Sequence, residues 1–208
     1  MPASGFLLIF ANIVPVMGVL YGGWNILDLL FIYWAESVII GFFNILKMLS
    51  AGEKNNRSIL LIVVDRLFAC SFFIVCYGGF MLLHAVFIFG LAAEFYKISF
   101  EPLALLAKTW PGLLSLFFSH GFSFISNYLL SREREKADIY SLMHQPYSRI
   151  VTMQISLIIG LWLTTFFGQP ALLLLFFLIM KTAADLNAHL KERKKFKPAH
   201  LHPALVKR

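Results

Sequence analysis

The sequence predicts an all-α protein, a polytopic transmembrane helical bundle of about six spans. Hydrophobic residues make up 59% of the 208 positions and charged residues 14%, whereas soluble domains average roughly 45–50% and about 25%. The 22 phenylalanines are too many for one soluble core of this length. Six helices of about 20 residues each use most of the chain. We therefore expect a single transmembrane domain over residues 1–190 and a basic cytoplasmic tail over 191–208.

The expected spans are apolar runs bounded by turn or charge signals. They cover residues 4–20, 25–48, 59–91, 103–130, 147–167 and 170–190. The first run is the weakest because Asn12 and Pro15 interrupt it, and no positive segment precedes it, so we interpret it as a retained span. The third run is longer than a bilayer requires, which predicts a strong tilt or a break near Gly78–Gly79. The short turn from Gly168 predicts that the last two spans form an antiparallel hairpin.

Lys and Arg in the loops predict the orientation. Only Lys97 and Lys108 fall on one side of the predicted membrane, and Arg66 and Lys181 fall within spans. The other side holds fourteen: Lys47, Lys54, Arg57, Arg132, Arg134, Lys136, Arg149, Lys191, Arg193, Lys194, Lys195, Lys197, Lys207 and Arg208. Cytoplasmic loops carry this excess in membrane proteins. We expect a multi-pass protein of the inner (cytoplasmic) membrane with both termini in the cytoplasm.

Composition also restricts the partners. The net charge is +7, and most Lys and Arg residues lie in loops next to apolar runs. This placement favours contact with anionic lipid headgroups at the cytoplasmic face over nucleic-acid binding. Cys70 and Cys76 are about 9 Å apart along a helix, beyond comfortable disulfide reach, and we interpret them as small apolar residues of one span. The bilayer is therefore the expected partner, and the sequence leaves the oligomeric state open, a homo-oligomer included.

The second span contains a carboxyl group near its centre. Glu36 lies there, with Asn44 two turns later on the same face. A charged group at the bilayer centre costs about 2.5–3.5 kcal/mol on insertion scales. Glu36 must therefore pair with a cation, be protonated or face water. It is either a clamp between helices or a proton carrier or general base.

The fourth span carries the densest group of polar residues. His120, Ser123 and Asn127 recur at helical spacing and so share one face, and Gly121 permits a close helix approach. Such stripes bind helices together or line a functional cavity. Ser123 beside His120 also suggests a nucleophile, but no GxSxG motif accompanies it.

The sixth span places Lys181, Asp185 and His189 on one face. Lys181 and Asp185 have the spacing of a helix salt bridge. Asp185 and His189 are also spaced as metal ligands one turn apart, but a metal site needs further ligands, and we predict none. No sequence motif indicates a cofactor.

Other polar residues have simpler interpretations. We expect Asp65 and Arg66 to form a structural anchor near the cytoplasmic start of their span, with Arg66 reaching toward the interface. His84 either hydrogen-bonds within the bundle or has a functional role. Arg149 is a positive-inside anchor or a ligand for a phosphate headgroup.

Depth brings the candidates together. Glu36, His120 and Ser123 fall near the middle of the predicted membrane, and Asn127, Lys181 and Asp185 fall toward its cytoplasmic half. This favours a small membrane enzyme or carrier with a cytoplasm-facing polar pocket. The alternative is a non-catalytic membrane scaffold or partner subunit whose polar residues cement helices.

Several segments together resemble an uncharacterised family of bacterial and archaeal polytopic membrane proteins, a domain of unknown function. The matching segments are YWAESVIIGFFNILK (33–47), 77–84, SHGFSFISNY (119–128), PYSR (146–149) and KTAADLNAH (181–189). The resemblance implies a membrane location and no established activity. Members of that family often carry His where this chain has Cys76 and Gln154, which argues against a multi-histidine metal site here.

Overall fold

The computed structural model describes residues 17–18, 21–52, 58–97, 101–130, 133–135, 137–168, 176 and 179–180. The chain forms two compact units, residues 1–148 and 149–208. Glu36, His120, Ser123 and Asn127 all lie in the first unit.

All regular elements among the described residues are helices. They are α2 (Ile26–Ser50), α3 (Ile59–Phe73), η1 (Ile74–Gly78), α4 (Gly79–Tyr96), α5 (Pro102–Ser123), η2 (Phe124–Leu130), η3 (Glu133–Glu135), α6 (Ile139–His144) and α7 (Tyr147–Phe167). Four continuous stretches are long and apolar enough to cross a membrane: Leu27–Ser50, Ile59–Gly90, Pro102–Leu130 and Ile139–Phe167. The all-helical prediction is confirmed for this part of the chain, and these stretches coincide with four of the six predicted runs. The runs at 4–20 and 170–190 lie almost entirely outside the described residues.

Polar groups fix both ends of α2. At the start, the Asn25 side chain accepts from the Asp28 backbone N–H at 3.0 Å, and the Asp28 carboxylate accepts from the Asn25 N–H at 2.6 Å. This capping box satisfies amide groups that have no partner within the helix. At the other end, the Arg66 guanidinium donates to the carbonyls of Leu49 and Ala51. Arg66, predicted to form a structural anchor with Asp65, therefore caps the C-terminus of a neighbouring helix.

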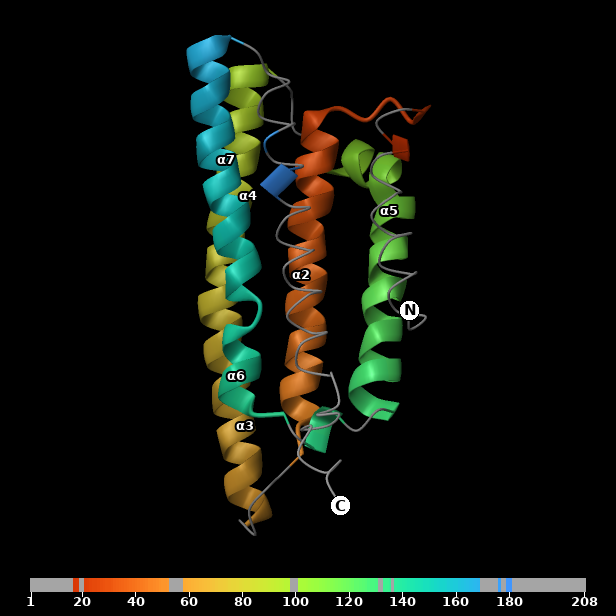
Figure 1. Cartoon of the computed structure of the whole chain (residues 1–208), viewed down its shortest axis with the longest axis vertical. Coiled ribbons are helices and arrows are strands. Elements are labelled where there is room, and N and C mark those ends of the chain that lie inside the picture. Colours follow the sequence, from red (N-terminus) through yellow and green to blue (C-terminus); the bar gives the residue numbers. More distant parts are fainter. Residues whose placement is uncertain are drawn as a thin grey trace, which may run out of the picture. The chain divides into compact units, whose positions relative to one another are not determined.

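The long helix α3–η1–α4 runs antiparallel to α2. Three side chains link them: Trp34 to the Met81 carbonyl, Tyr77 to the Ser37 carbonyl, and Arg66 to the Leu49 carbonyl. The sequence separations of these pairs fall from 47 to 40 to 17 residues toward the C-terminus of α2. Only antiparallel helices give this trend, and Figure 1 shows it.

The helix α5–η2 runs parallel to α2 on another side. Lys108 binds the Asp28 carboxylate at 2.6 Å near the start of both helices. Tyr128 donates to the Lys47 carbonyl at 2.8 Å near the end of both. The separations of 80 and 81 residues are almost equal, which is the signature of a parallel pair. In Figure 1, α2 stands between α4 and α5.

A wide helical turn lies near Gly78–Gly79, where the sequence predicted either a break or a strong tilt of the whole run. The helix continues through the π-helical turn η1, which turns Tyr77 toward α2, where its hydroxyl donates to the Ser37 carbonyl at 2.6 Å. The ring lies against α2 at Gly41, where an added Cβ would come within 2.5 Å of it. Gly41 is therefore required for the tyrosine to reach the α2 backbone.

The predicted loop 131–146 is partly wrong, because it contains α6. Pro146 separates α6 from α7 and has no N–H, so the Leu142 carbonyl lacks its usual helical donor. Asn44 of α2 donates its side-chain amide to that carbonyl at 2.9 Å, beside a turn bond from Gln145 at 3.2 Å. A buried amide of one helix thus stabilises the proline break of another.

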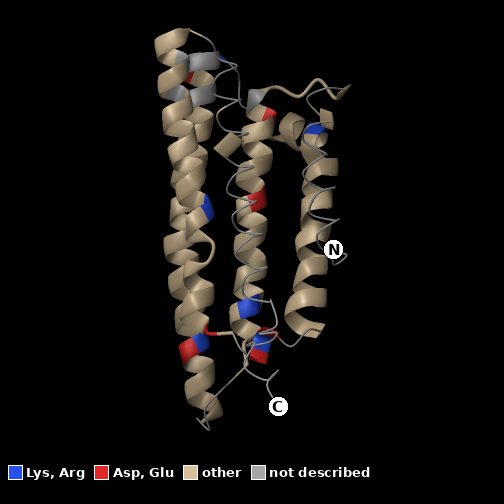
Figure 2. Ribbon diagram, in the orientation of Figure 1, with Lys and Arg blue, Asp and Glu red and all other residues tan. Residues whose placement is uncertain are grey.

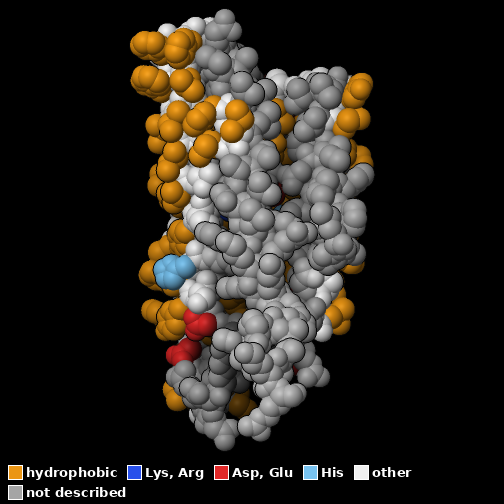
Figure 3. All heavy atoms as spheres, in the orientation of Figure 1, with side chains coloured by type: hydrophobic (Ala, Val, Ile, Leu, Met, Phe, Trp, Pro, Cys, Tyr) orange, Lys and Arg blue, Asp and Glu red, His pale blue; other side chains and the backbone are white. Residues whose placement is uncertain are grey.

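The outer surface of the described helices is apolar. Side chains of α3, η1 and α4 such as Phe68, Val75 and Leu83 are more than two thirds exposed. In Figure 2 the charged residues gather toward the two ends of the helices, with few between. In Figure 3 hydrophobic side chains line the outer edges of the visible surface. This distribution suits helices surrounded by lipid.

Candidate functional site

Glu36 and His120 meet at the centre of the first unit. Glu36 lies midway along α2 and is 1% exposed. His120 lies on α5, and its Nε2 is 3.6 Å from Glu36 Oε1. The predicted proximity of these two residues is confirmed. The distance exceeds that of a good hydrogen bond, so the two groups form a close ion-pair contact when the imidazole is protonated.

The imidazole has unused hydrogen-bonding capacity. His120 Nε2 is buried and has no hydrogen-bond partner among the residues that the structure describes. The side chain as a whole is 17% exposed, compared with 2% for that of Glu36. Buried polar atoms normally find a partner, and those that do not are frequent at functional sites. His120 is therefore the accessible member of the pair.

Ser123 and Asn127 follow His120 toward the end of α5–η2. Asn127 donates to the Ser123 hydroxyl at 3.2 Å, and Ser126 donates to the Asn127 side-chain carbonyl at 3.3 Å. The predicted single α-helical stripe is altered here, because the π-helical segment η2 begins at Phe124 and a wider turn rotates the residues after it. The three candidates lie on the continuous helix α5–η2. Ser123 contacts Asn127, and His120 contacts Glu36.

The remaining candidates of the sixth span cannot be placed. Lys181 and Asp185, with His189, lie outside the described residues. Asn44 is buried, but its amide serves the Leu142 carbonyl, which is a structural role. His84 of α4 is 1% exposed, and its ring lies 6.4 Å from that of Phe80.

Arg149 lies near the start of a helix, as the predicted run at 147–167 implies. It is the third residue of α7 and lies inside the apolar stretch Ile139–Phe167. Trp34 and Tyr77 were missed as helix-linking residues. A glycine within a long apolar helix, such as Gly41, was the signal for a bulky neighbour.

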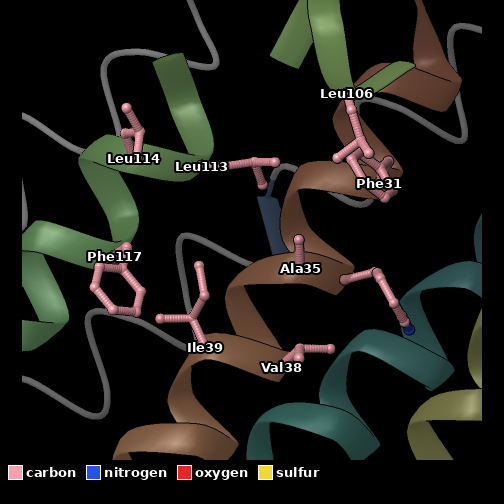
Figure 4. Close-up of a pocket in the computed structure, with 9 residues that line it drawn as sticks. Phe31, Ala35, Val38, Ile39, Leu106, Leu113, Leu114 and Phe117 are labelled. Atoms are coloured by element: carbon pink, nitrogen blue, oxygen red, sulfur yellow. The ribbon is translucent and has the colours of Figure 1, made fainter. Parts of the chain in front are cut away.

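An apolar groove lies between α2 and α5, and Figure 4 shows its walls. Its volume is about 370 Å³. The lining residues are Phe31, Trp34, Ala35, Val38 and Ile39 of α2 and Leu106, Leu113, Leu114 and Phe117 of α5. No charged side chain lines it. This groove is not the polar pocket predicted around Glu36 and His120, because neither residue lines it.

The pair is suited to acid–base chemistry. A carboxyl group and an imidazole can exchange one proton, and exclusion of water strengthens the interaction between them. The described residues contain no group of three or more His, Cys, Asp or Glu side chains placed to hold a metal ion. The carboxyl–imidazole contact of Glu36 and His120 is a chemically active feature of the described residues.

Comparison with known proteins identifies the family. The family of unknown function DUF6498 matches residues 2–202, and the chain belongs to it. No curated protein and no solved structure matches the chain.

Proposed function

We propose that this member of the DUF6498 family is a six-span protein of the cytoplasmic membrane whose Glu36–His120 pair binds and releases a proton during its activity. The activity is that of a small membrane enzyme or carrier. Both termini lie in the cytoplasm, and the runs at 4–20 and 170–190 supply the first and last spans. Ser123, Asn127, Lys181 and Asp185 belong to the same polar region, which opens toward the cytoplasm.

The contact between Glu36 and His120 carries this proposal. A carboxylate buried in the middle of a membrane helix is costly, and Glu36 lies 3.6 Å from the imidazole of His120. The Nε2 of that imidazole has no hydrogen-bond partner among the described residues. Buried ionisable groups that lie beside one another are candidates for a functional site.

A scaffold function is the second candidate, and a specific set of contacts favours it. Trp34, Asn44, Tyr77 and Tyr128 each donate to a backbone carbonyl of another element. Contacts of this kind cement helices and need no activity. If the protein is a scaffold, Glu36 and His120 also serve only to hold helices together, like these four residues.

Labelling with dicyclohexylcarbodiimide separates the two functions. This apolar reagent partitions into the bilayer and modifies protonated carboxyl groups. In proteoliposomes we expect modification of Glu36, detected by mass spectrometry of its peptide, and faster modification in acidic than in alkaline buffer. His120→Leu should raise the rate, because the carboxylate loses the partner that favours its charged form.

The exposed His144 provides the matched control, since His144→Leu removes an imidazole from the same unit without touching the pair. Its rate should equal that of the wild type. A Glu36 that stays unmodified at every pH, or whose rate is indifferent to His120, would support the scaffold and overturn the proton-binding proposal.

The proposed topology has its own test. Reporter fusions at Gly52, at Ala137 and at the C-terminus should all report the cytoplasm. A periplasmic signal from any of the three positions would contradict six spans with cytoplasmic termini.

A further inference from the structure

We infer that the proton of the Glu36–His120 pair enters and leaves at one end of the first unit only, through water held along a polar stripe on the helix α5–η2. The stripe consists of Ser123, Ser126 and Asn127. It leads to the end where α2 and η2 finish, which the proposed topology places in the cytoplasm. The inference rests on the proposed function, because it gives the proton-binding pair its route to water.

The imidazole of His120 is placed to connect the buried carboxyl group with this stripe. Its Nε2, which lies 3.6 Å from Glu36, is buried, so the 17% exposure of the side chain belongs to the rest of the ring. An imidazole can accept a proton at one nitrogen and release it from the other. His120 can therefore pass a proton between Glu36 and water on the far side of the ring.

The stripe begins one helical turn after His120. His120 and Ser123 both belong to α5, and side chains three residues apart on an α-helix have Cβ atoms about 5–6 Å apart. One water molecule can bridge such a gap. The Ser123 hydroxyl accepts from Asn127 at 3.2 Å, which leaves its own O–H to donate to that water.

The stripe then continues toward the end of η2. Asn127 donates to Ser123, and Ser126 donates to Asn127 at 3.3 Å. All three side chains are half-buried, whereas their neighbours Phe122 and Ile125 are exposed, so the polar groups are turned away from the surface that suits lipid. Seven residues separate His120 from Asn127, about 10 Å of helix. Half of the hydrocarbon core is about 15 Å thick, so the stripe covers most of the way to the membrane surface.

The half of α5 that precedes His120 is different. The α5 side chains that line the groove toward α2 all lie in this half and are apolar: Leu106, Leu113, Leu114 and Phe117 (Figure 4). Thr109 and Ser115 of the same half donate to carbonyls of their own helix at 2.7 and 2.8 Å. A hydroxyl bonded in this way has no O–H left to donate to water. Among the described residues of α5–η2, the side chains that can hold a file of water therefore lie on one side of the pair.

Reaction of a single thiol with silver ions tests the route, because Ag⁺ reacts with thiols that water reaches and does not enter lipid. In a chain that carries Cys70→Ala and Cys76→Ala, Ser123→Cys places a thiol on the stripe, and Ser115→Cys places one eight residues earlier on the same helix. Both serines are half-buried, so the two variants are matched. Ser58→Cys, exposed at the start of α3, marks the end of the unit where the stripe emerges.

Sealed vesicles of the two orientations are exposed to Ag⁺ from outside, and the thiol that remains is measured by maleimide labelling after denaturation. The thiol of Ser123→Cys should react from the same side as that of Ser58→Cys and about tenfold faster than from the other side, the ratio that 1.4 kcal/mol in a barrier gives. The thiol of Ser115→Cys should react slowly from both sides. A Ser123→Cys thiol that reacts equally from both sides, or as slowly as that of Ser115→Cys, would overturn the inference.

Deuterium exchange of the Glu36 carboxyl group tests whether the stripe carries the proton. In infrared spectra of proteoliposomes in acidic buffer, replacement of H₂O by D₂O should shift the carboxyl band. We expect Asn127→Leu to slow this shift about tenfold, because an apolar side chain interrupts the file of water. Ser115→Ala removes a hydroxyl from the apolar half and should leave the rate unchanged. Equal rates in Asn127→Leu and the wild type would contradict the route.

The route and the proposed function fail in different ways. A Glu36 that shows no protonated-carboxyl band and resists carbodiimide at every pH would overturn both. A Glu36 that is modified and deuterated while Asn127→Leu has no effect would keep the proton-binding pair and overturn only the route along the stripe.

Discussion

The stretches Leu27–Ser50 and Ile59–Gly90 are both apolar enough to cross a membrane, yet they are buried to different extents. In the most apolar window of each, 61% of the first is buried inside the structure but only 17% of the second. The more hydrophobic stretch is the more exposed one. In a soluble protein the order would be reversed. We infer that polar contacts to α2 stabilise the centre of this unit, whereas the exposed apolar side chains of the second stretch suit contact with lipid.

The largest expected difference between the two stretches is in how glycine substitutions change stability. Gly41→Leu on α2 should prevent folding or lower the detergent melting temperature sharply, because even a Cβ would come within 2.5 Å of the Tyr77 ring. Overpacking of this kind costs about 1–3 kcal/mol for a few added methylenes. Gly90→Leu on α4 is the matched control, since nothing lies within 4 Å of an added Cβ there. Similar melting temperatures for the two variants would contradict the close packing of Tyr77 on α2.

A smaller effect is expected where α2 supports the proline break. Asn44→Leu should destabilise the protein by about 1 kcal/mol, because the Leu142 carbonyl loses a side-chain donor. Pro146→Ala restores a backbone N–H to the same helix, so Asn44→Leu should cost less in that background. A double-mutant cycle from detergent melting measures the difference. Additive effects would show that the amide does not serve the broken helix.

The smallest effect is expected for a single hydroxyl. Tyr77→Phe should cost about 0.6 kcal/mol, the average for a hydrogen bond between membrane helices, because it removes the bond to the Ser37 carbonyl. Tyr140→Phe alters an exposed phenol of α6 and should change the melting temperature little. If the two variants melt alike, the hydrogen bond contributes nothing measurable.

Sequence reasoning anticipated the parts of this structure that depend on hydrophobicity and depth. Four apolar runs appear as helices, and Glu36 and His120, predicted to share one polar region at mid-membrane, lie close together, because an ionisable group at that depth must turn toward another polar group. Their direct contact depends on helix rotation and was left open. The contacts that depend on helix rotation were not predictable. The π-helical turn that aims Tyr77 at α2, and the pairing of Asn44 with a carbonyl freed by Pro146, arise only when the helices are assembled. The same is true of the groove, whose two walls come from segments about 80 residues apart in the sequence.

Infrared spectroscopy of the Glu36 carboxyl group tests the central claim most directly. In proteoliposomes, lowering the pH should produce a protonated-carboxyl band that is absent from Glu36→Gln. If the pair exchanges protons with water, that band should shift when H₂O is replaced by D₂O, and its pH dependence should change in His120→Leu. A band that never appears, or one that appears without a deuterium shift, would contradict a proton-binding role for the pair.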